Sequence, residues 1–268
     1  MVRFTSIPKE KHSLFNEDAI LAFSSGLAVS DGAGGGGIFA ELWSNYLVSN
    51  VPNNPILSWE DFDKWLSAIW ENYYNSCELK ATSMGGLALE KFYDEGSYAT
   101  LAAVWLDNKT HYCYWMSYGD SVAFHYRAIK STLECSISSL ESFNEPPYLI
   151  NCKDAPNKEG FSSGVFKLHR DSVVFVCSDA LSHYVLLMYY IENKHKYNEI
   201  IKRCINSHTK NSSIVKTALY SKCGTFKNAF LKLVSSSKNR ANFRRHLSSL
   251  ERKGLLSSDD YSFGFIRL

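Results

Sequence analysis

Apolar residues in this chain gather in short runs separated by polar and glycine-containing segments. Runs typical of β-strands occupy residues 19–23, 27–29, 112–116, 173–177 and 263–266. Residues 97–127 contain several such runs, rich in Tyr, Trp and Val, and are predicted to form an antiparallel meander. Residues 164–169 and 172–177 are predicted to pair as a hairpin, and 261–268 to form a final strand.

Other stretches have the apolar spacing of helices. The pattern predicts helices over 38–48 and 59–75, the second capped by Ser58 with Asp61 three residues later. Residues 181–253 are also predicted to be helical, with polar breaks. Strands that enclose an inserted helical segment indicate an α+β domain in which one sheet packs on another.

Composition is that of an ordinary globular protein. The 268 residues are 45% apolar and 14% aromatic, enough to bury the core of one large domain or two small ones. Residues 1–11 lack the apolar stretch of a secretory signal, and no window approaches the ~18 apolar residues of a membrane span. Seven scattered cysteines without a Cys-x-x-Cys pair favour reduced thiols over a zinc site or disulfides. We therefore expect a cytoplasmic protein that contacts no membrane.

Charge is distributed unevenly. Residues 201–254 contain thirteen Lys or Arg and the single acid Glu251, although the whole chain has a formal charge of only +2. The remainder therefore carries about ten net negative charges. The basic segment is predicted to be either a solvated helical surface or a docking face for acidic or phosphorylated partners. It lacks the interleaved aromatic residues of a nucleic-acid platform, so we expect no nucleic acid to bind.

Acidic residues adjoin the apolar runs at five places. The motifs are Asn-Glu-Asp-Ala at 16–19, Asp-Gly-Ala-Gly-Gly at 31–35, Gly-Asp-Ser at 119–121, Ser-Asp at 178–179 and Asp-Asp at 259–260. Each acid alone has an ordinary explanation, since Asp31 and Asp120 suit glycine turns and Asp179 suits a helix cap. A common core can bring strand ends together, and several carboxylates in one place repel one another unless cations neutralise them. The repeated pattern predicts a site for hard divalent cations, as in a metal-dependent hydrolase.

Two shorter motifs suggest other functions. Residues 32–37 match the dinucleotide-binding fingerprint, but Asp31 would place a carboxylate where a pyrophosphate should bind. Residues 160–164 match the nucleophile elbow of serine hydrolases, although the predicted order is loop then strand, not strand then helix. The glycines after Asp31 more simply allow a sharp turn in which the Gly32 carbonyl faces a cation.

Together the motifs resemble those of the metal-dependent protein phosphatases of type 2C, the PPM family, in their compact bacterial form. The motifs in the family's order are Asn-Glu-Asp at 16–18, Asp-Gly-x-Gly-Gly at 31–35, Gly-Ser-x-Ala-Thr at 96–100, Gly-Asp-Ser at 119–121, Ser-Asp at 178–179 and Asp-Asp-x-Ser at 259–262. They cover nearly the whole chain. The resemblance implies one domain over 1–268, a four-layer α-β-β-α sandwich of two antiparallel sheets flanked by helices. Residues 181–256 would form a helical flap inserted in it.

The resemblance also implies a centre of two Mg²⁺ or Mn²⁺ ions, with or without a third. Its implied ligands are Glu17, Asp18, Asp31, Gly32, Asp120, Asp179 and Asp259. Asp31 would bridge the two ions, Gly32 would offer its carbonyl, and Asp120 would bind the third ion. Asp31, Asp179 and Asp259 are the implied catalytic residues, because they would hold the ions around a bridging water that attacks phosphorus directly.

Three positions depart from the family pattern. Ser13 replaces the arginine that commonly grips the substrate phosphate, so Lys11 or His12 is expected to take that role. Ala33 replaces a histidine proposed as a general acid, and Ala180 replaces a glycine. Losing a proton donor can lower the rate roughly 10²-fold to 10⁴-fold. The alternative to an active enzyme is a pseudophosphatase of the same fold that acts as a binding or regulatory module.

The sequence thus predicts a metal-dependent protein serine/threonine phosphatase, a phosphoric monoester hydrolase. Its expected substrate is a protein carrying phosphoserine or phosphothreonine, made by a cognate Ser/Thr kinase. The protein is expected to be a monomer.

Overall fold

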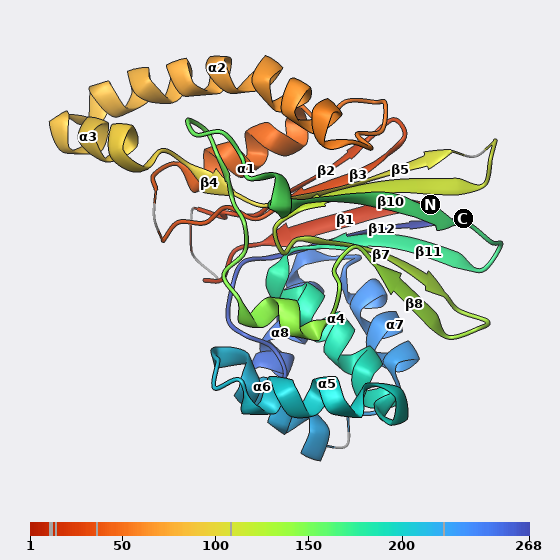
Figure 1. Cartoon of the computed structure of the whole chain (residues 1–268). Coiled ribbons are helices and arrows are strands. Elements are labelled where there is room, and N and C mark those ends of the chain that lie inside the picture. Colours follow the sequence, from red (N-terminus) through yellow and green to blue (C-terminus); the bar gives the residue numbers. More distant parts are fainter. Residues whose placement is uncertain (11–12, 14, 36, 108, 222) are drawn as a thin grey trace.

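Two five-stranded antiparallel sheets form the centre of the molecule (Figure 1). The computed structural model describes residues 1–10, 13, 15–35, 37–107, 109–221 and 223–268. The first sheet has the strand order β1 (Val2–Ile7), β12 (Tyr261–Arg267), β11 (Ser172–Cys177), β7 (Val122–Arg127) and β8 (Thr132–Cys135). The second has the order β10 (Phe161–Lys167), β6 (Tyr112–Tyr118), β5 (Leu101–Asp107), β3 (Gly26–Ser30) and β2 (Ala19–Phe23).

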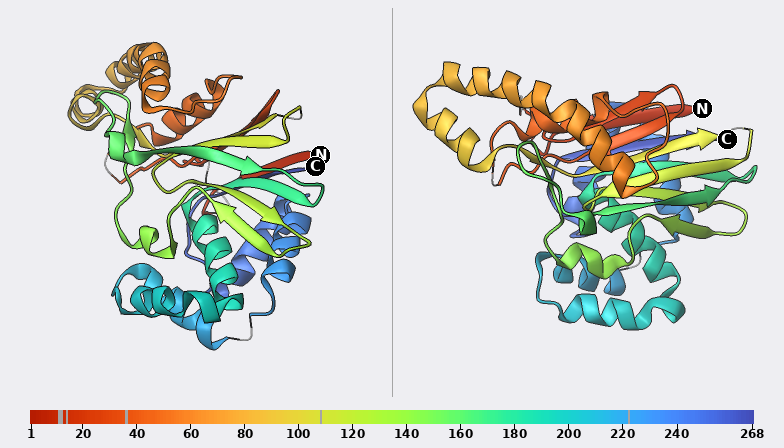
Figure 2. Two further views of the ribbon diagram at one scale, coloured as in Figure 1. Left: turned by 45° about the vertical axis from the view of Figure 1, so that its right-hand side comes forward. Right: turned by 45° about the horizontal axis from the view of Figure 1, so that its top comes forward.

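Helices cover the two outer faces of the sheet pair (Figures 1 and 2). Over the second sheet lie α1 (Ala40–Ser49), α2 (Trp59–Met84) and α3 (Gly86–Glu95). On the side of the first sheet lie α4 (Asp179–Glu192), α5 (Lys194–Asn206), α6 (Lys210–Tyr220), α7 (Phe226–Ser236) and α8 (Arg240–Arg252). Short elements complete the chain: β4 (Tyr98–Ala99), η1 (Leu140–Asn144), β9 (Ile150–Asn151) and η2 (Lys158–Gly160).

The layers follow from the two-residue period of the strands. In β11, Val174 and Val176 belong to the apolar cluster between the sheets, whereas Phe175 and Cys177 belong to the cluster that includes helix α4. Because successive side chains point to opposite faces, a strand that is apolar throughout can fill two cores at once. The α+β sandwich of two antiparallel sheets flanked by helices, implied by the resemblance, is confirmed.

The predicted hairpin of 164–169 with 172–177 is wrong. Strand β10 pairs with β6 in the second sheet, whereas β11 pairs with β7 and β12 in the first. Phe166 of β10 and Val174 of β11 lie in the same cluster between the sheets. The two runs therefore pack face to face and form no strand ladder; they are joined only at the turn, where the Ser172 amide donates to the His169 carbonyl at 2.9 Å. Apolar patterning alone does not specify this choice.

The predicted meander is correct only in part. Strands β5 and β6 pair antiparallel, but β7 belongs to the first sheet. The Gly119-Asp120-Ser121 turn therefore crosses from one sheet to the other. Gly119 has a φ of 83°, a backbone conformation that disfavours other residues. This crossing places Asp120 at the end of the sandwich, between the two sheets.

Helix boundaries are closer to expectation. Ser58 caps α2, its hydroxyl accepting a hydrogen bond from the backbone amide of Asp61 at 3.1 Å. The helix continues to Met84, beyond the predicted end at 75, and β1 was not predicted. No helix that the structure describes has the length and apolar character needed to cross a membrane. All seven cysteines are unpaired, as expected.

Candidate functional site

The acidic motifs meet at one end of the sandwich. Asp18 directly precedes β2, Asp31 directly follows β3, Asp120 lies between β6 and β7, Asp179 begins α4 just after β11, and Asp259 lies two residues before β12. Neighbouring strands run in opposite directions, so the end of one strand lies beside the start of the next. This alternation brings together acids that are far apart in the sequence.

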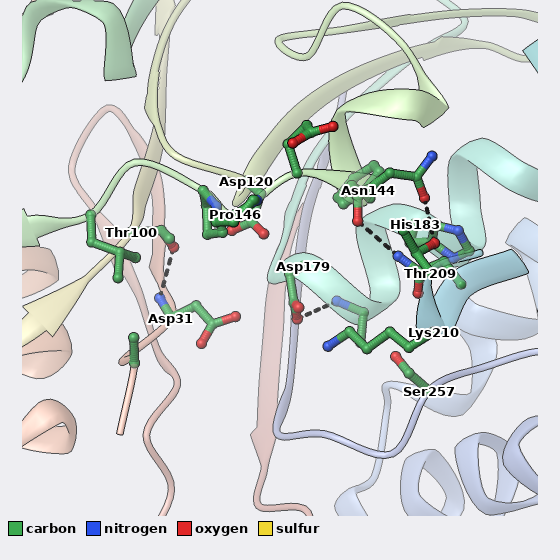
Figure 3. A pocket seen from close by; sticks show the side chains of 17 residues that line it. Asp31, Thr100, Asp120, Asn144, Pro146, Asp179, His183, Thr209, Lys210 and Ser257 are labelled. Atoms are coloured by element: carbon green, nitrogen blue, oxygen red, sulfur yellow. Dashed lines mark hydrogen bonds between the residues drawn. The ribbon is translucent and has the colours of Figure 1, made fainter. Parts of the chain in front are cut away.

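Asp31, Asp120 and Asp179 line a cavity of about 340 Å³ (Figure 3). The remaining walls come from residues 143–149, from α4 and from the start of α6. Asp18 lines a separate hollow of about 600 Å³, together with Asn16 and Glu41. The other implied ligands, Glu17, Gly32 and Asp259, line neither space. The predicted ligands therefore do not all line one cavity.

Burial and mutual repulsion govern the Asp31 and Asp179 carboxyl groups. Both keep some exposure toward the cavity, but surrounding protein removes most of their hydration. Burial, followed by the charges of Asp18 and Asp179, raises the Asp31 pKa well above its ordinary value. Burial also raises the Asp179 pKa, although the Ala180 amide and a hydrogen bond from Asp31 oppose the rise. The ionised pair is therefore costly without a cation.

Asp18 is the most enclosed acid, with 3% of its surface exposed. Burial raises its pKa well above the ordinary value, and the nearby hydroxyls of Ser178 and Ser262 only partly oppose the rise. Neither of its carboxylate oxygens has a hydrogen-bond partner of ordinary geometry among the described residues. Buried oxygens without donors suit coordination of a hard cation.

Asp120 and Asp259 lie at the margins of the cluster. Burial and the charge of Asp179 raise the pKa of Asp120 to about 7. The same two causes raise the pKa of Asp259 to about 6. Both groups thus titrate close to neutral pH in the protein without metal.

Asp260 has a different role from its neighbour Asp259. Its two carboxylate oxygens accept hydrogen bonds from the backbone amides of Lys9, at 2.5 Å, and Glu17, at 2.6 Å. It therefore ties the N-terminal segment to the start of β12. Within the described ranges, Asp259 accepts only from the Asp260 amide, at 3.0 Å, so its other carboxylate oxygen has no partner there.

The glycine loop after β3 is shaped by close backbone approach. A side chain on Gly32 would lie 2.7 Å from the backbone oxygens of Ala40 and Glu17, so only glycine fits. At Gly34 the same addition would meet the Glu17 carboxylate, which packs against the loop. Burial and the charge of Asp260 raise the pKa of Glu17, and the Gly34 amide opposes this rise.

Two motif hydroxyls position Asp31. The Thr100 hydroxyl accepts a hydrogen bond from the Asp31 amide at 3.3 Å, and the Thr100 amide donates to the Asp31 carbonyl at 2.8 Å. Thr100 and Ser121 also share a hydrogen bond, 2.7 Å between their hydroxyl oxygens. The Gly-Ser-x-Ala-Thr and Gly-Asp-Ser motifs thus hold the backbone of Asp31 in place.

Sequence reasoning missed two groups in the cavity, Lys210 and His183. In the sequence Lys210 is one of thirteen basic residues of its segment, and no motif includes His183. Their folded proximity to Asp179 gives them significance, and His183, four residues after Asp179 on one helix, is the one that spacing could have flagged. Lys11 and His12, predicted to grip phosphate, lie outside the described residues. Ala33 lines the cavity, as expected for a residue beside Asp31.

The acids are close but do not form a finished ligand shell. Among the described residues, no three His, Cys, Asp or Glu side chains are already arranged around a common ion position. The carboxylates nevertheless shift one another's pKa, and Asp18 supplies two unpartnered buried oxygens. This all-oxygen donor set fits Mg²⁺ or Mn²⁺ better than a softer metal.

Several solved bacterial phosphatases share this fold. A bacterial serine phosphatase bearing a point mutation has a TM-score of 0.52 and 17% identity, covering 100% of this chain and 98% of that one. The serine/threonine phosphatase Stp1 from Staphylococcus aureus has a TM-score of 0.51 and 15% identity, covering 100% and 94%. The catalytic domain of the serine/threonine phosphatase PstP, in complex with two manganese ions, has 0.50 and 13%, covering 99% and 96%.

At these identities the likeness establishes the fold, which is that of the bacterial serine/threonine phosphatases of type 2C. Comparison with protein families and with curated proteins found no match.

Proposed function

We propose that this protein is a metal-dependent serine/threonine protein phosphatase. One observation carries the proposal: Asp18, Asp31 and Asp179 are crowded together with raised pKa values, and both Asp18 oxygens lack partners among the described residues. Such a cluster is unfavourable when ionised and becomes favourable when divalent cations neutralise it. The fold shared with the manganese-bound PstP domain supports the same function.

The residues that would hold the metal are those implied by the family resemblance. Asp31 would bridge two ions, Asp179 and Asp259 would hold one, and Glu17 and Asp18 would bind directly or through water. When bound, two such ions activate water and neutralise phosphate oxygens, so phosphoester hydrolysis needs no covalent intermediate. Asp120 would bind a further ion.

The cavity itself favours an extended substrate over a deeply enclosed small molecule. Residues of the 143–149 segment, among them Pro146 and Pro147, form part of its wall, and the cavity is partly open. A phosphoserine or phosphothreonine side chain could enter while its backbone stayed outside. We therefore propose a phosphorylated protein as substrate. A cognate kinase, a monomeric state and a cytoplasmic location stay predictions from the sequence.

Hydrolysis of p-nitrophenyl phosphate and of a phosphothreonine peptide tests the function directly. The purified protein should turn over both substrates with Mn²⁺ or Mg²⁺ and neither with EDTA. Titration of Mn²⁺ by calorimetry should show binding whether or not turnover occurs.

The second candidate, a pseudophosphatase, is favoured by Ala33, which lines the cavity where a proton donor would be useful. Mn²⁺ binding without turnover of either substrate would establish that alternative. Absence of both binding and turnover would refute the metal centre itself.

A further inference from the structure

Among the described residues, one lysine reaches the acidic cavity from the helical side. Lys210 is the first residue of α6 and lines the cavity together with Asp31, Asp120 and Asp179. Its side chain extends toward Asp179 (Figure 3). It forms no ion pair within 4.0 Å in the part of the chain that the structure describes. A cation that reaches into the site without a close partner is placed to bind an anionic ligand.

Hydrogen bonds to η1 fix the start of α6. The Thr209 hydroxyl donates to Asn144 Oδ1 at 2.9 Å, and Asn211 Nδ2 donates to the Phe143 carbonyl at 2.9 Å. Asn211 is 6% exposed, so its bond is shielded from water. These bonds flank Lys210 on both sides, and they hold its backbone at the edge of the cavity.

An ion pair strengthens the same connection. Arg203 of α5 makes two hydrogen bonds to the Glu141 carboxylate, at 2.6 and 2.7 Å. The bidentate geometry resists rotation of one element against the other. Helices α5 and α6 are thus attached to η1, whose C-terminal residues also form the cavity wall. Contacts with η1 therefore fix the backbone position of Lys210, although its side chain is exposed.

The charge of Lys210 acts on the site. Burial is the main influence on the pKa values of Asp120, Asp179 and Asp259, and it raises all three. Lys210 opposes that rise in each case. These three acids belong to different segments, so the ammonium group lies on the side of the cluster that Asp120, Asp179 and Asp259 form.

Other candidates for an anion-binding role fit less well. His183 lines the cavity, but burial and the charge of Lys210 lower its pKa to about 4, so it is neutral at physiological pH. Lys9 opposes the raised pKa of Asp259 but does not line the cavity. Arg244 donates to the carbonyls of Pro8 and Lys9 and supports the N-terminal segment instead.

We propose that Lys210 binds the phosphate group of the substrate and supplies the positive charge missing at Ser13. The proposal rests on the proposed phosphatase function. A divalent centre would neutralise the carboxylates, which leaves the Lys210 ammonium free to donate hydrogen bonds to phosphate oxygens. The ligand class is a phosphomonoester dianion, or inorganic phosphate as product. Binding from α6 means that the helical segment takes part in substrate recognition.

The test compares Lys210→Gln, Lys210→Arg and the matched control Lys216→Gln, an exposed lysine on the same helix. Each full-length protein is assayed with Mn²⁺ on p-nitrophenyl phosphate, with inorganic phosphate as competitive inhibitor. Lys210→Gln should raise both KM and the inhibition constant of phosphate about 10-fold or more, as expected for loss of a charge-assisted hydrogen bond. Lys210→Arg should restore most of the affinity, and Lys216→Gln should match the parent protein.

Mn²⁺ affinity separates phosphate binding from simple charge balance. Removing a cation beside the carboxylates should leave Mn²⁺ binding unchanged or tighter, so weaker phosphate binding cannot then be attributed to lost metal. Unchanged phosphate inhibition in Lys210→Gln would overturn the proposal while the phosphatase function stood. So would a rise in the inhibition constant only in a parallel Lys9→Gln variant.

If the parent protein shows no turnover, calorimetry with Mn²⁺ and inorganic phosphate tests whether Lys210 binds phosphate. Phosphate binding that weakens in Lys210→Gln would support Lys210 in a protein that is not an enzyme. Absence of phosphate binding by the parent protein would refute the role of Lys210.

Discussion

Acids at the end of the sandwich and bases on the neighbouring helices have opposite relations to solvent. Asp18 is almost completely buried, and Asp31 and Asp179 face a cavity with most of their hydration removed. Of the twelve lysines and arginines of residues 201–254 that the structure describes, eleven are exposed and Arg244 is half-buried. A buried charge interacts strongly with its neighbours, whereas water and salt screen an exposed one.

The comparison explains why the smaller group of charges, the carboxylates, has the stronger electrostatic effects. A few carboxylates shift one another's pKa, because they converge at strand ends within low-dielectric surroundings. The larger number of basic residues is spread over the four helices α5 to α8 and their joints. Lys210 links the two regions, since it belongs to the basic segment and lines the acidic cavity.

The largest expected effect is on the acidic side. Asp31→Asn should lower metal-dependent turnover by more than about 10²-fold, because even partners of metal ligands contribute 10-fold to 100-fold to metal affinity or activity. The metal-free variant should be as stable as the parent protein or more so, because a repelling buried charge is gone. Turnover assays and thermal melts in EDTA measure both effects. Asp63→Asn, an exposed acid on α2, is the matched control, and full activity in Asp31→Asn would refute the bridging role.

The second largest expected effect is a pH dependence of the stability of the metal-free protein, which should disappear when metal binds. With pKa values raised to about 7 and about 6, Asp120 and Asp259 stabilise the metal-free fold at low pH and lose that contribution as pH rises through 6 to 7. His183 and His246, with pKa values lowered to about 4, act in the opposite sense, since they destabilise the fold as pH falls below 6.5. The aspartate contribution must therefore be isolated with a variant.

The double variant Asp120→Asn with Asp259→Asn isolates the contribution of the two aspartates to the pH dependence of stability. In EDTA its melting temperature should exceed that of the parent more at pH 8 than at pH 5, by about 2 to 4 °C for each kcal/mol of relieved repulsion. Saturating Mn²⁺ should reverse the order by stabilising the parent selectively. Parallel melting curves across this pH range would show that the two acids are not coupled to folding.

The smallest effects are on the basic side. Arg244→Ala removes hydrogen bonds to the Pro8 carbonyl at 2.8 Å and the Lys9 carbonyl at 3.4 Å, and should lower the free energy of unfolding by about 1 to 2 kcal/mol. Arg245, which is exposed and bonded to Asn242 on its own helix, should change stability by less than about 0.5 kcal/mol. Denaturant titration measures this difference between adjacent arginines.

Arg245→Ala is therefore the cleaner test of docking by the basic helices. If they bind acidic substrates, Arg245→Ala should lower turnover of a phosphoprotein by up to about 5-fold, which corresponds to the free energy of one exposed ion pair. Turnover of p-nitrophenyl phosphate should stay unchanged. An equal change for both substrates would identify these helices as a solvated surface without a docking role.

The sequence was sufficient for the motifs and the sandwich, since each acidic motif adjoins an apolar run and apolar periodicity marks most strands and helices. It was not sufficient for strand pairing. The run 164–169 looks like a partner of 172–177, yet its apolar side chains pack across the core between the sheets. Patterning specifies which residues are buried, but several pairings bury the same residues.

The amino-acid sequence by itself determined which residues can bind a hard cation, because carboxylate chemistry and glycine turns are local properties. Only the tertiary structure decided which of these residues bind backbone amides and which line the cavity. Asp260 holds backbone amides while Asp259 keeps a free oxygen, and Lys210 alone among the described basic residues of its segment lines the acidic cavity. Proximity across long sequence separations arises from the packing of two sheets and a helical layer, and no local pattern encodes it.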